Sequence, residues 1–274
     1  MMIGQRELLN KISGQVERGR FPRFSILIGE KGSGKKTLAM EICKMLDMVC
    51  IQANTTAEHI RYITEDSYKI TEPLVYLIPD CDNMSSAAAN SLLKVTEEPP
   101  QNAYFILTCE SIDNLLSTIK SRGVTYMLEP YTYEDKCDYL STHTPLNEED
   151  ETFILNVASN VGEVAELSAM NITEFREYVN LVIDNIAEVS DSNSFKIAEK
   201  LNFKDDKDKF DLRLFLRAFN TICVDRMLRS DDPLKYANAV AITGDTLQEL
   251  HIRGINKQMT LDKWILDIRE AWYE

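Results

Sequence analysis

The sequence predicts a doubly wound α/β domain with a five-stranded parallel sheet, followed by two helical domains. Short apolar runs alternate with helical patterns through residues 1–130, whereas only amphipathic helical patterns occur after Pro130. Apolar runs without polar alternation are typical of parallel strands that are covered on both faces. We therefore expect an α/β domain at residues 1–130, a helical domain at 131–188 and a second helical domain at 189–274.

The predicted strands are five short apolar runs. They lie at residues 24–28, 49–51, 74–78, 104–108 and 124–128. Helical patterns between them, such as Thr37–Leu46 and Ser85–Thr96, complete βαβ units. The second of these helices should end before Pro99-Pro100, because proline cannot continue a helix.

The region after Pro130 has the signals of helical bundles. Thr132, with Asp135 three residues later, predicts the capped start of a helix. The charged stretch 204–209 is most simply a solvated turn. The last predicted helix has an apolar stripe on one face. Its members are Leu261, Trp264, Ile265, Ile268 and Trp272.

Charge and cysteine usage exclude several classes of protein. The chain has 30 basic and 44 acidic residues, a net charge of −14, which argues against a protein that grips DNA alone. Six scattered cysteines without a Cys-x-x-Cys pair predict neither a zinc site nor a disulfide framework. No signal peptide or transmembrane span is readable, so we expect a cytoplasmic protein with reduced thiols.

A glycine-rich loop follows the first predicted strand and opens a helix. In such a P-loop, backbone N–H groups wrap phosphate oxygens, the helix N-terminus favours the anion, and the lysine reaches the outer phosphates. ATP or ADP is therefore the candidate ligand. The residues predicted to bind it are Gly29, Gly32, Ser33, Gly34, Lys35, Lys36 and Thr37.

One position of this loop departs from the pattern. The residue after Lys35 should be Ser or Thr, whose hydroxyl binds Mg²⁺, but the sequence has Lys36. Thr37 comes one residue late, and one helical step turns it about 100° away from the site. The sequence thus predicts phosphate binding without a regular magnesium site.

Two further segments resemble bacterial clamp-loader subunits of the DNA polymerase III type, which belong to the AAA+ family. The segment 90–100, Asn-Ser-Leu-Leu-Lys-Val-Thr-Glu-Glu-Pro-Pro, is similar to the family's Asn-Ala-Leu-Leu-Lys-x-x-Glu-Glu-Pro-Pro. The segment 118–123 is similar to Thr-Ile-x-Ser-Arg-Cys, with Gly123 in place of the cysteine. The resemblance implies an AAA+ P-loop domain at 1–130, a lid domain at 131–188 and a collar domain at 189–274.

The resemblance also places the groups that hydrolyse ATP in motor subunits. The Walker B acidic pair falls at Pro79 and Asp80, and proline offers no ligand. Asp80 is one methylene shorter than the usual Glu, so it would hold the attacking water poorly. A second register, with Asp80 as the Walker B Asp, puts Cys81 in the catalytic position. The position that corresponds to the family's lid arginine is occupied by Ala165, so this arginine is absent.

The departures at Lys36, Pro79 and Ala165 resemble the delta-prime subunit, the hydrolysis-inactive member of the ring. Many bacterial relatives carry a four-cysteine zinc module that is absent here, so no zinc is expected. The compact form is compatible with a phage-encoded or divergent loader.

Arg122 then corresponds to the family's arginine finger, which reaches the ATP of a neighbouring subunit. Such a finger is worth roughly 10³–10⁵ in rate. Glu97 and Glu98 are interpreted as solvated helix-end residues.

Three hypotheses follow from the sequence. The first is a clamp-loader subunit without its own ATPase activity. Its implied partners are other loader subunits, the sliding clamp and, through the assembled complex, primer–template DNA. No interaction with a membrane is expected. The second is a motor subunit that hydrolyses ATP through Asp80. The third is an AAA+ initiator or helicase-loader relative that binds DNA. No helix-turn-helix or basic C-terminal module is evident, which counts against the third.

Overall fold

The computed structural model describes residues 2–143, 146–186, 211–250, 252 and 254–273. The chain divides into two compact units. The α/β unit comprises Met1–Tyr139 with Asn160–Gly162, and the helical unit comprises Leu140–Ser159 with Glu163–Glu274. The expected boundary between residues 188 and 189, and the charged stretch 204–209, lie outside the described residues.

The α/β unit is built on a five-stranded sheet in which every strand pair is parallel. The strands are β1 (Phe24–Ile28), β2 (Val49–Gln52), β3 (Leu74–Ile78), β4 (Ala103–Cys109) and β5 (Val124–Met127), in the spatial order β2-β3-β4-β1-β5. β2 and β5 are therefore the edge strands. The predicted α/β class and the five parallel strands are confirmed.

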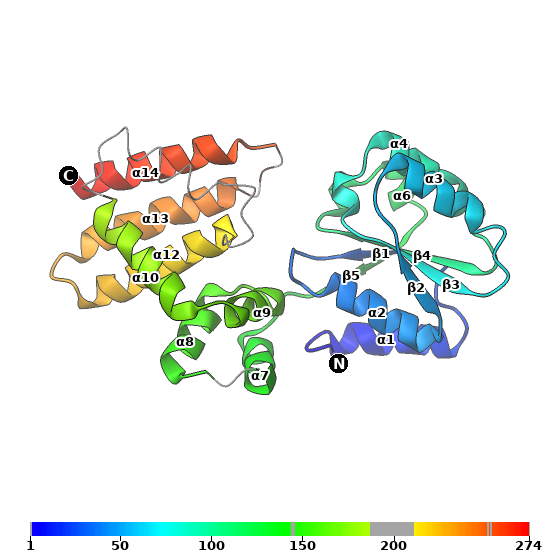
Figure 1. Ribbon diagram of the computed structural model, residues 1–274, viewed down its shortest axis with the longest axis horizontal. Helices are drawn as coiled ribbons and strands as arrows, with labels where there is room; N and C mark the ends of the chain where they lie inside the picture. Colours follow the sequence, from blue (N-terminus) through cyan, green and yellow to red (C-terminus); the bar gives the residue numbers. More distant parts are fainter. Residues whose placement is uncertain (1, 144–145, 187–210, 251, 253, 274) are drawn as a thin grey trace. The chain divides into compact units, whose positions relative to one another are not determined.

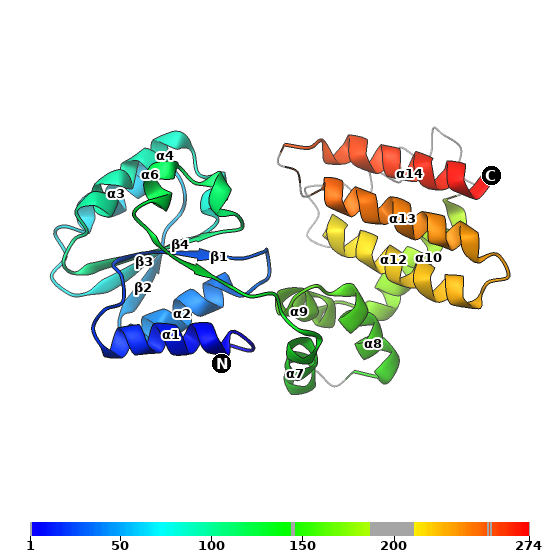
Figure 2. The ribbon, with the colours of Figure 1, turned by 180° about the vertical axis from the view of Figure 1, so that it is seen from behind.

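Helices cover both faces of this sheet (Figures 1 and 2). One face carries α1 (Arg6–Glu17) and α2 (Lys35–Leu46), and the other carries α3 (Ala57–Asp66), α4 (Ser86–Ser91), α5 (Leu93–Glu97) and α6 (Ser117–Lys120). Neighbouring residues of β1 face opposite layers: Ile26 packs with the α3 layer and Leu27 with the α2 layer, and both are fully buried. Burial on both faces explains why the strands have no polar alternation.

One predicted helix is interrupted. The pattern Ser85–Thr96 forms α4 and α5, which are separated at Leu92. The side chain of Ser85 accepts a hydrogen bond from the backbone N–H of Ala88 and so caps the start of α4. Two short 3₁₀ turns, η1 (Cys81–Asn83) and η2 (Ile112–Asn114), follow β3 and β4.

The candidate site residues lie in loops at two opposite ends of the parallel sheet. The carboxyl ends of β1, β3 and β4 lead into the glycine-rich loop, into Asp80 and into Glu110, respectively. In open α/β sheets, ligands bind at this end of the strands. The segment before β5, which contains Arg122, lies at the opposite end.

The second part of the chain is helical. Its elements are α7 (Tyr133–His143), α8 (Glu148–Val157), α9 (Val161–Ala169), α10 (Ile172–Asn185), α12 (Leu212–Arg229), α13 (Pro233–Glu249) and α14 (Lys257–Tyr273). The predicted capping box before α7 forms: the backbone N–H of Asp135 donates to Thr132 Oγ1 at 3.1 Å, and that of Thr132 donates to Asp135 Oδ2 at 2.9 Å. None of these described helices is long and apolar enough to cross a membrane.

The core of the helical unit surrounds Trp264 of α14. This side chain is fully buried, and its Nε1–H donates to Thr243 Oγ1 of α13 at 2.8 Å. Its ring meets Phe215 and Phe219 of α12 edge-on, with centroids 6.3 and 5.0 Å away. The predicted stripe is thus the buried face of α14; Trp272, at its end, is partly exposed and donates to the Lys235 carbonyl.

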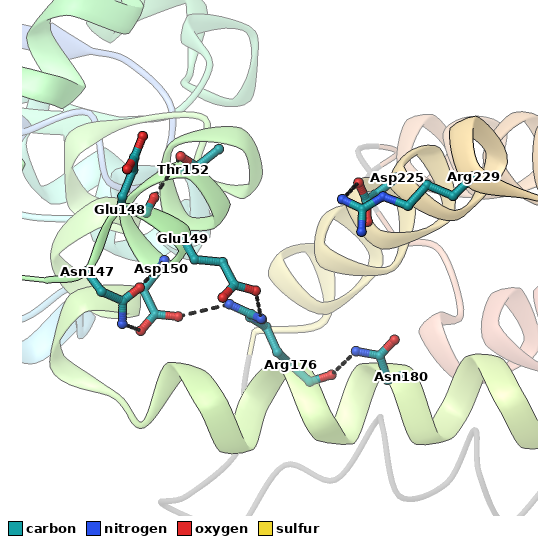
Figure 3. A network of polar contacts seen from close by, with 9 residues as sticks. All are labelled: Asn147, Glu148, Glu149, Asp150, Thr152, Arg176, Asn180, Asp225 and Arg229. Carbon is teal, nitrogen blue, oxygen red and sulfur yellow. Dashed lines mark hydrogen bonds and ion pairs between the residues drawn. The ribbon is translucent and has the colours of Figure 1, made fainter.

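Ion pairs fasten two helices of this unit to each other. Arg176 of α10 donates to Asp150 Oδ1 at 3.0 Å and also to Glu149, both on α8 (Figure 3). Asn180, one turn further along α10, donates to the Arg176 carbonyl at 2.9 Å. Because Arg176 also lies over the Phe153 ring, it fixes α8 against α10 through both its charge and its apolar stem.

Candidate functional site

The glycine-rich loop joins β1 to α2 in a backbone conformation that needs glycine. Gly32 and Gly34 have φ angles of +83° and +87°, a region that residues with a Cβ rarely adopt. Gly34 caps α2, whose first residue is Lys35. The N–H groups in the first turn of a helix have no intrahelical acceptor and carry a positive partial charge, so this loop is shaped to receive an anion.

Lys35 lies inside the loop. The side chain is only 8% exposed, and its Nζ donates to the carbonyls of Gly29 at 2.6 Å and Glu30 at 2.8 Å. Burial lowers the pKa of Lys35, while the carboxylates of Glu110 and Asp80 oppose that change. An ammonium group has three donors, so one remains for a phosphate oxygen.

Ser33 and Tyr131 define one wall of the loop. The Tyr131 hydroxyl donates to the Ser33 carbonyl at 3.0 Å. Ser33 is 6% exposed, and within the described part of the chain its Oγ has no hydrogen-bond partner. A buried hydroxyl without a partner is costly, so this oxygen is available to a ligand of the loop.

A second segment of the α/β unit, Asn160–Gly162, closes on the loop from another side. Asn160 Nδ2 donates to the Lys31 carbonyl at 3.0 Å, and the Gly162 N–H donates to the Gly32 carbonyl at 3.2 Å. A Cβ on Gly162 would lie 2.6 Å from the backbone of Gly32, so the close approach requires glycine there. These contacts use loop carbonyls and leave the N–H groups of the helix start to a ligand. No sequence motif predicts these contacts of Asn160 and Gly162 with the loop.

Lys36 and Thr37 are both exposed on the first turn of α2. Lys36 therefore puts a positive charge where a magnesium-binding hydroxyl is required. Among the described residues, no cluster of three or more His, Cys, Asp or Glu side chains could hold a metal ion. The loop fits a phosphate group and does not supply the usual ligand for its magnesium ion.

The segment after β3 carries the remaining candidate carboxylate. Asp80 follows Pro79 with φ +51°, and its backbone N–H donates to Thr108 Oγ1 at 3.1 Å. This geometry places Asp80 at the same end of the sheet as Lys35, and its carboxylate opposes the lowering of the Lys35 pKa by burial. Proline at position 79 leaves Asp80 without the acidic neighbour that a magnesium site uses.

In the second register, Cys81 takes the catalytic position, but its environment does not suit it to act as a base. Cys81 is 2% exposed, its thiol contacts the Ile78 carbonyl, and burial raises the pKa of the thiol. Asp82 is committed to the loop after β4, because it accepts the backbone N–H groups of Glu110 at 2.7 Å and Ser111 at 3.1 Å. Asp80 is thus the carboxylate of this segment that a ligand can use.

Arg122 lies between α6 and the edge strand β5. Its Nη1 donates to the Thr118 carbonyl at 3.2 Å, and its Nη2 donates to Glu97 Oε1 at 3.0 Å. Gly123 permits this turn because a Cβ there would come within 2.5 Å of the buried Ile26 side chain. The sequence identified Arg122, but it assigned Glu97 no role.

The structure separates Arg122 from the loop of its own chain. β1 and β5 are paired and parallel, from Ser25 opposite Val124 to Ile28 opposite Met127. The loop follows the end of β1, whereas Arg122 precedes the start of β5. Three strand residues alone separate the two levels by about 10 Å. Lys35 and Asp80 therefore lie together at one end, and Arg122 lies at the other; Ala165 lies in α9.

The chain matches known families and structures over different parts of its length. The family described as "DNA polymerase III, delta subunit" matches residues 49–132, which include Asp80, Glu97 and Arg122. The DNA polymerase III subunit gamma of Buchnera aphidicola subsp. Schizaphis graminum is 28% identical over 170 residues, 51% of this chain and 47% of the relative. The subunit delta' of Bacillus subtilis is 26% identical over 203 residues, 60% and 59% of the two chains.

A solved structure extends the comparison to the fold. A DNA polymerase III gamma subunit-related protein from Thermotoga maritima covers 96% of this chain and 99% of its own, with a TM-score of 0.56 and 17% identity. The same order of α/β and helical parts thus occurs in that protein. The chain spans about half the length of the curated relatives that it matches.

Proposed function

We propose that this chain is a delta-prime-like clamp-loader subunit of the AAA+ family that completes a hetero-oligomeric ring without hydrolysing ATP. In this proposal, Arg122 acts as an arginine finger at the ATP of a neighbouring subunit. The partners are other clamp-loader subunits, and the assembled complex acts on a sliding clamp and primer–template DNA.

The placement of Arg122 is the observation that carries this proposal. The guanidinium lies before an edge strand, at the end of the sheet opposite the loop of its own chain. It cannot serve a nucleotide held by Lys35, but an edge position leaves it accessible to another subunit. A guanidinium acts most strongly where charge develops on the transferring phosphoryl group, so its contribution appears in kcat of the neighbour.

The chain's own loop supports binding more than hydrolysis. Gly32, Gly34, Lys35 and the Ser33 hydroxyl, which no described residue hydrogen-bonds, fit the phosphates of ATP or ADP. Phosphoryl transfer depends on a metal ion and a positioned water. Lys36 and Pro79 replace the usual ligands of the magnesium ion, and Asp80 is one methylene shorter than the glutamate that positions the water. Bound nucleotide would supply phosphate charge to order this loop, and we assign it no chemical step in this chain.

The first test measures the ATPase rate of the isolated chain. We expect the wild-type rate to equal that of Lys35→Ala, because the groups that position magnesium and water are absent. A Lys31→Ala variant, which changes an exposed lysine of the same loop, serves as the control. A turnover of about 1 s⁻¹ that disappears in Lys35→Ala would instead favour a motor subunit that works through Asp80.

The second test concerns magnesium. We expect the affinity for labelled ATP to change less than about threefold between EDTA and excess Mg²⁺, because Lys36 repels a divalent cation and can itself contact phosphate. Lys36→Thr, which restores a hydroxyl at this position, should make binding tighter in magnesium than in EDTA. A large magnesium-dependent gain in the wild-type chain would contradict the role given to Lys36.

A further inference from the structure

We propose that Glu97 is a positioning residue for Arg122: its carboxylate holds the guanidinium in the orientation that engages the neighbour's ATP. This inference rests on the proposed function, because it assigns a role to the group that orients the finger. Glu97 is the last residue of α5 and is 25 residues away from Arg122 in the sequence. Only the fold brings the two side chains together.

The guanidinium is held at two points of different chemistry. The Thr118 carbonyl, one turn earlier on α6, accepts from Nη1, and the Glu97 carboxylate accepts from Nη2. Arginine has five N–H donors in a rigid planar fork, so three that the described residues do not use remain for a phosphate. The side chains of Arg122 and Glu97 are 36% and 56% exposed, which leaves the fork open to an incoming ligand.

Glu97 is presented by a rigid carrier. Its neighbours Val95 and Thr96 are buried, and Thr96 Oγ1 donates to the Leu93 carbonyl at 2.7 Å. Tyr68 lies in the turn that follows α3, and its hydroxyl donates to the Glu98 carbonyl at 2.7 Å. The end of α5 is therefore fixed on both sides of Glu97, and the carboxylate can define a direction for Arg122.

Two effects of this carboxylate oppose each other. Glu97 holds the long side chain of Arg122 in place before it meets the neighbour's ATP, which removes part of the entropy cost of that contact. Its negative charge also disfavours an approaching phosphate. Exposed charges interact weakly because solvent screens them, whereas a misplacement of about 1 Å at a reacting centre can cost up to 10²-fold in rate. Positioning therefore outweighs repulsion.

The test uses the complex reconstituted from this chain and its ATPase partner subunits. Glu97→Ala should lower clamp- and DNA-stimulated kcat by about three- to tenfold, a part of the misplacement cost, with KM for ATP and assembly unchanged. Glu97→Gln keeps an oxygen acceptor and should retain most of the rate. Glu98→Ala, which removes the adjacent exposed carboxylate, should have no effect.

A double variant separates positioning from a general structural effect. In the Arg122→Ala background, Glu97→Ala should cause no further loss, because there is no finger left to orient. An equal loss in both backgrounds, or a rise in kcat for Glu97→Ala alone, would overturn the inference. If Arg122→Ala lowers turnover but Glu97→Ala does not, only the positioning role fails. If Arg122→Ala itself leaves turnover unchanged, the proposed function fails.

Discussion

Arg122→Ala should lower the ATP turnover of the assembled complex by about 10³-fold or more at the site that the finger serves, the range expected for an arginine supplied in trans. The reason is that the guanidinium stabilises charge that develops only in the transition state. KM for ATP should therefore change little. Turnover is measured with sliding clamp and primer–template DNA present, after size-exclusion chromatography has confirmed assembly.

The chain provides sharp controls for this variant. Arg122→Lys should rescue poorly, because a compact ammonium cannot reproduce the planar fork. Lys120→Ala removes a charge two residues away, where Lys120 pairs with Asp113 at 3.2 Å, and should leave turnover near wild type. The exposed pair between Arg122 and Glu97 is worth about 0–1 kcal/mol, so the fold should survive. Unchanged turnover in a complex with Arg122→Ala would make this arginine an ordinary surface charge.

Trp264→Ala should destabilise the helical unit by about 3–5 kcal/mol, the cost of removing a large buried aromatic side chain. Trp264 is fully buried, contacts Phe215 and Phe219, and satisfies its N–H on Thr243. Its loss leaves a cavity that the surrounding helices can fill only in part. The measurement is chemical denaturation followed by the unfolding transition of the helical unit.

Two companion variants make that result interpretable. Trp264→Phe keeps an aromatic ring and should cost clearly less than Trp264→Ala, because the cavity is smaller. Leu228→Ala on α12 changes a side chain that is 76% exposed and should stay within about 0.5 kcal/mol of wild type. A loss below about 1 kcal/mol for Trp264→Ala would mean that this tryptophan is not the centre of the core.

Sequence patterns predicted those strands and helices whose buried faces are visible in their own apolar spacing. The strands were readable because apolar side chains such as Ile26 and Leu27 are needed on both faces of a covered parallel sheet. The stripe on the last helix was readable for the same reason. The break at Leu92 was not, because Leu92 keeps helical dihedral angles (φ −79°, ψ −16°), so the apolar spacing runs through it.

The site was predictable only where a motif fixes the residue types in sequence. The loop needs glycines and Lys35 at set spacing, so it could be recognised. Asn160 and Tyr131 contact the loop from 129 and 98 residues away, and single polar residues carry no spacing signal. Glu97 was part of a recognised motif, yet its contact with Arg122 depends on how α5 and α6 pack.

Whether this chain activates ATP hydrolysis by its neighbours is tested by titrating it into a fixed amount of its ATPase partner subunits, with clamp- and DNA-stimulated turnover as the readout. We predict that wild-type chain, inactive alone, raises turnover to a plateau at the stoichiometry of the complex, and that Arg122→Ala assembles without that rise. A turnover equal to the sum of the rates of this chain and of its partners measured separately, with this chain contributing its own Lys35-dependent activity, would contradict this prediction.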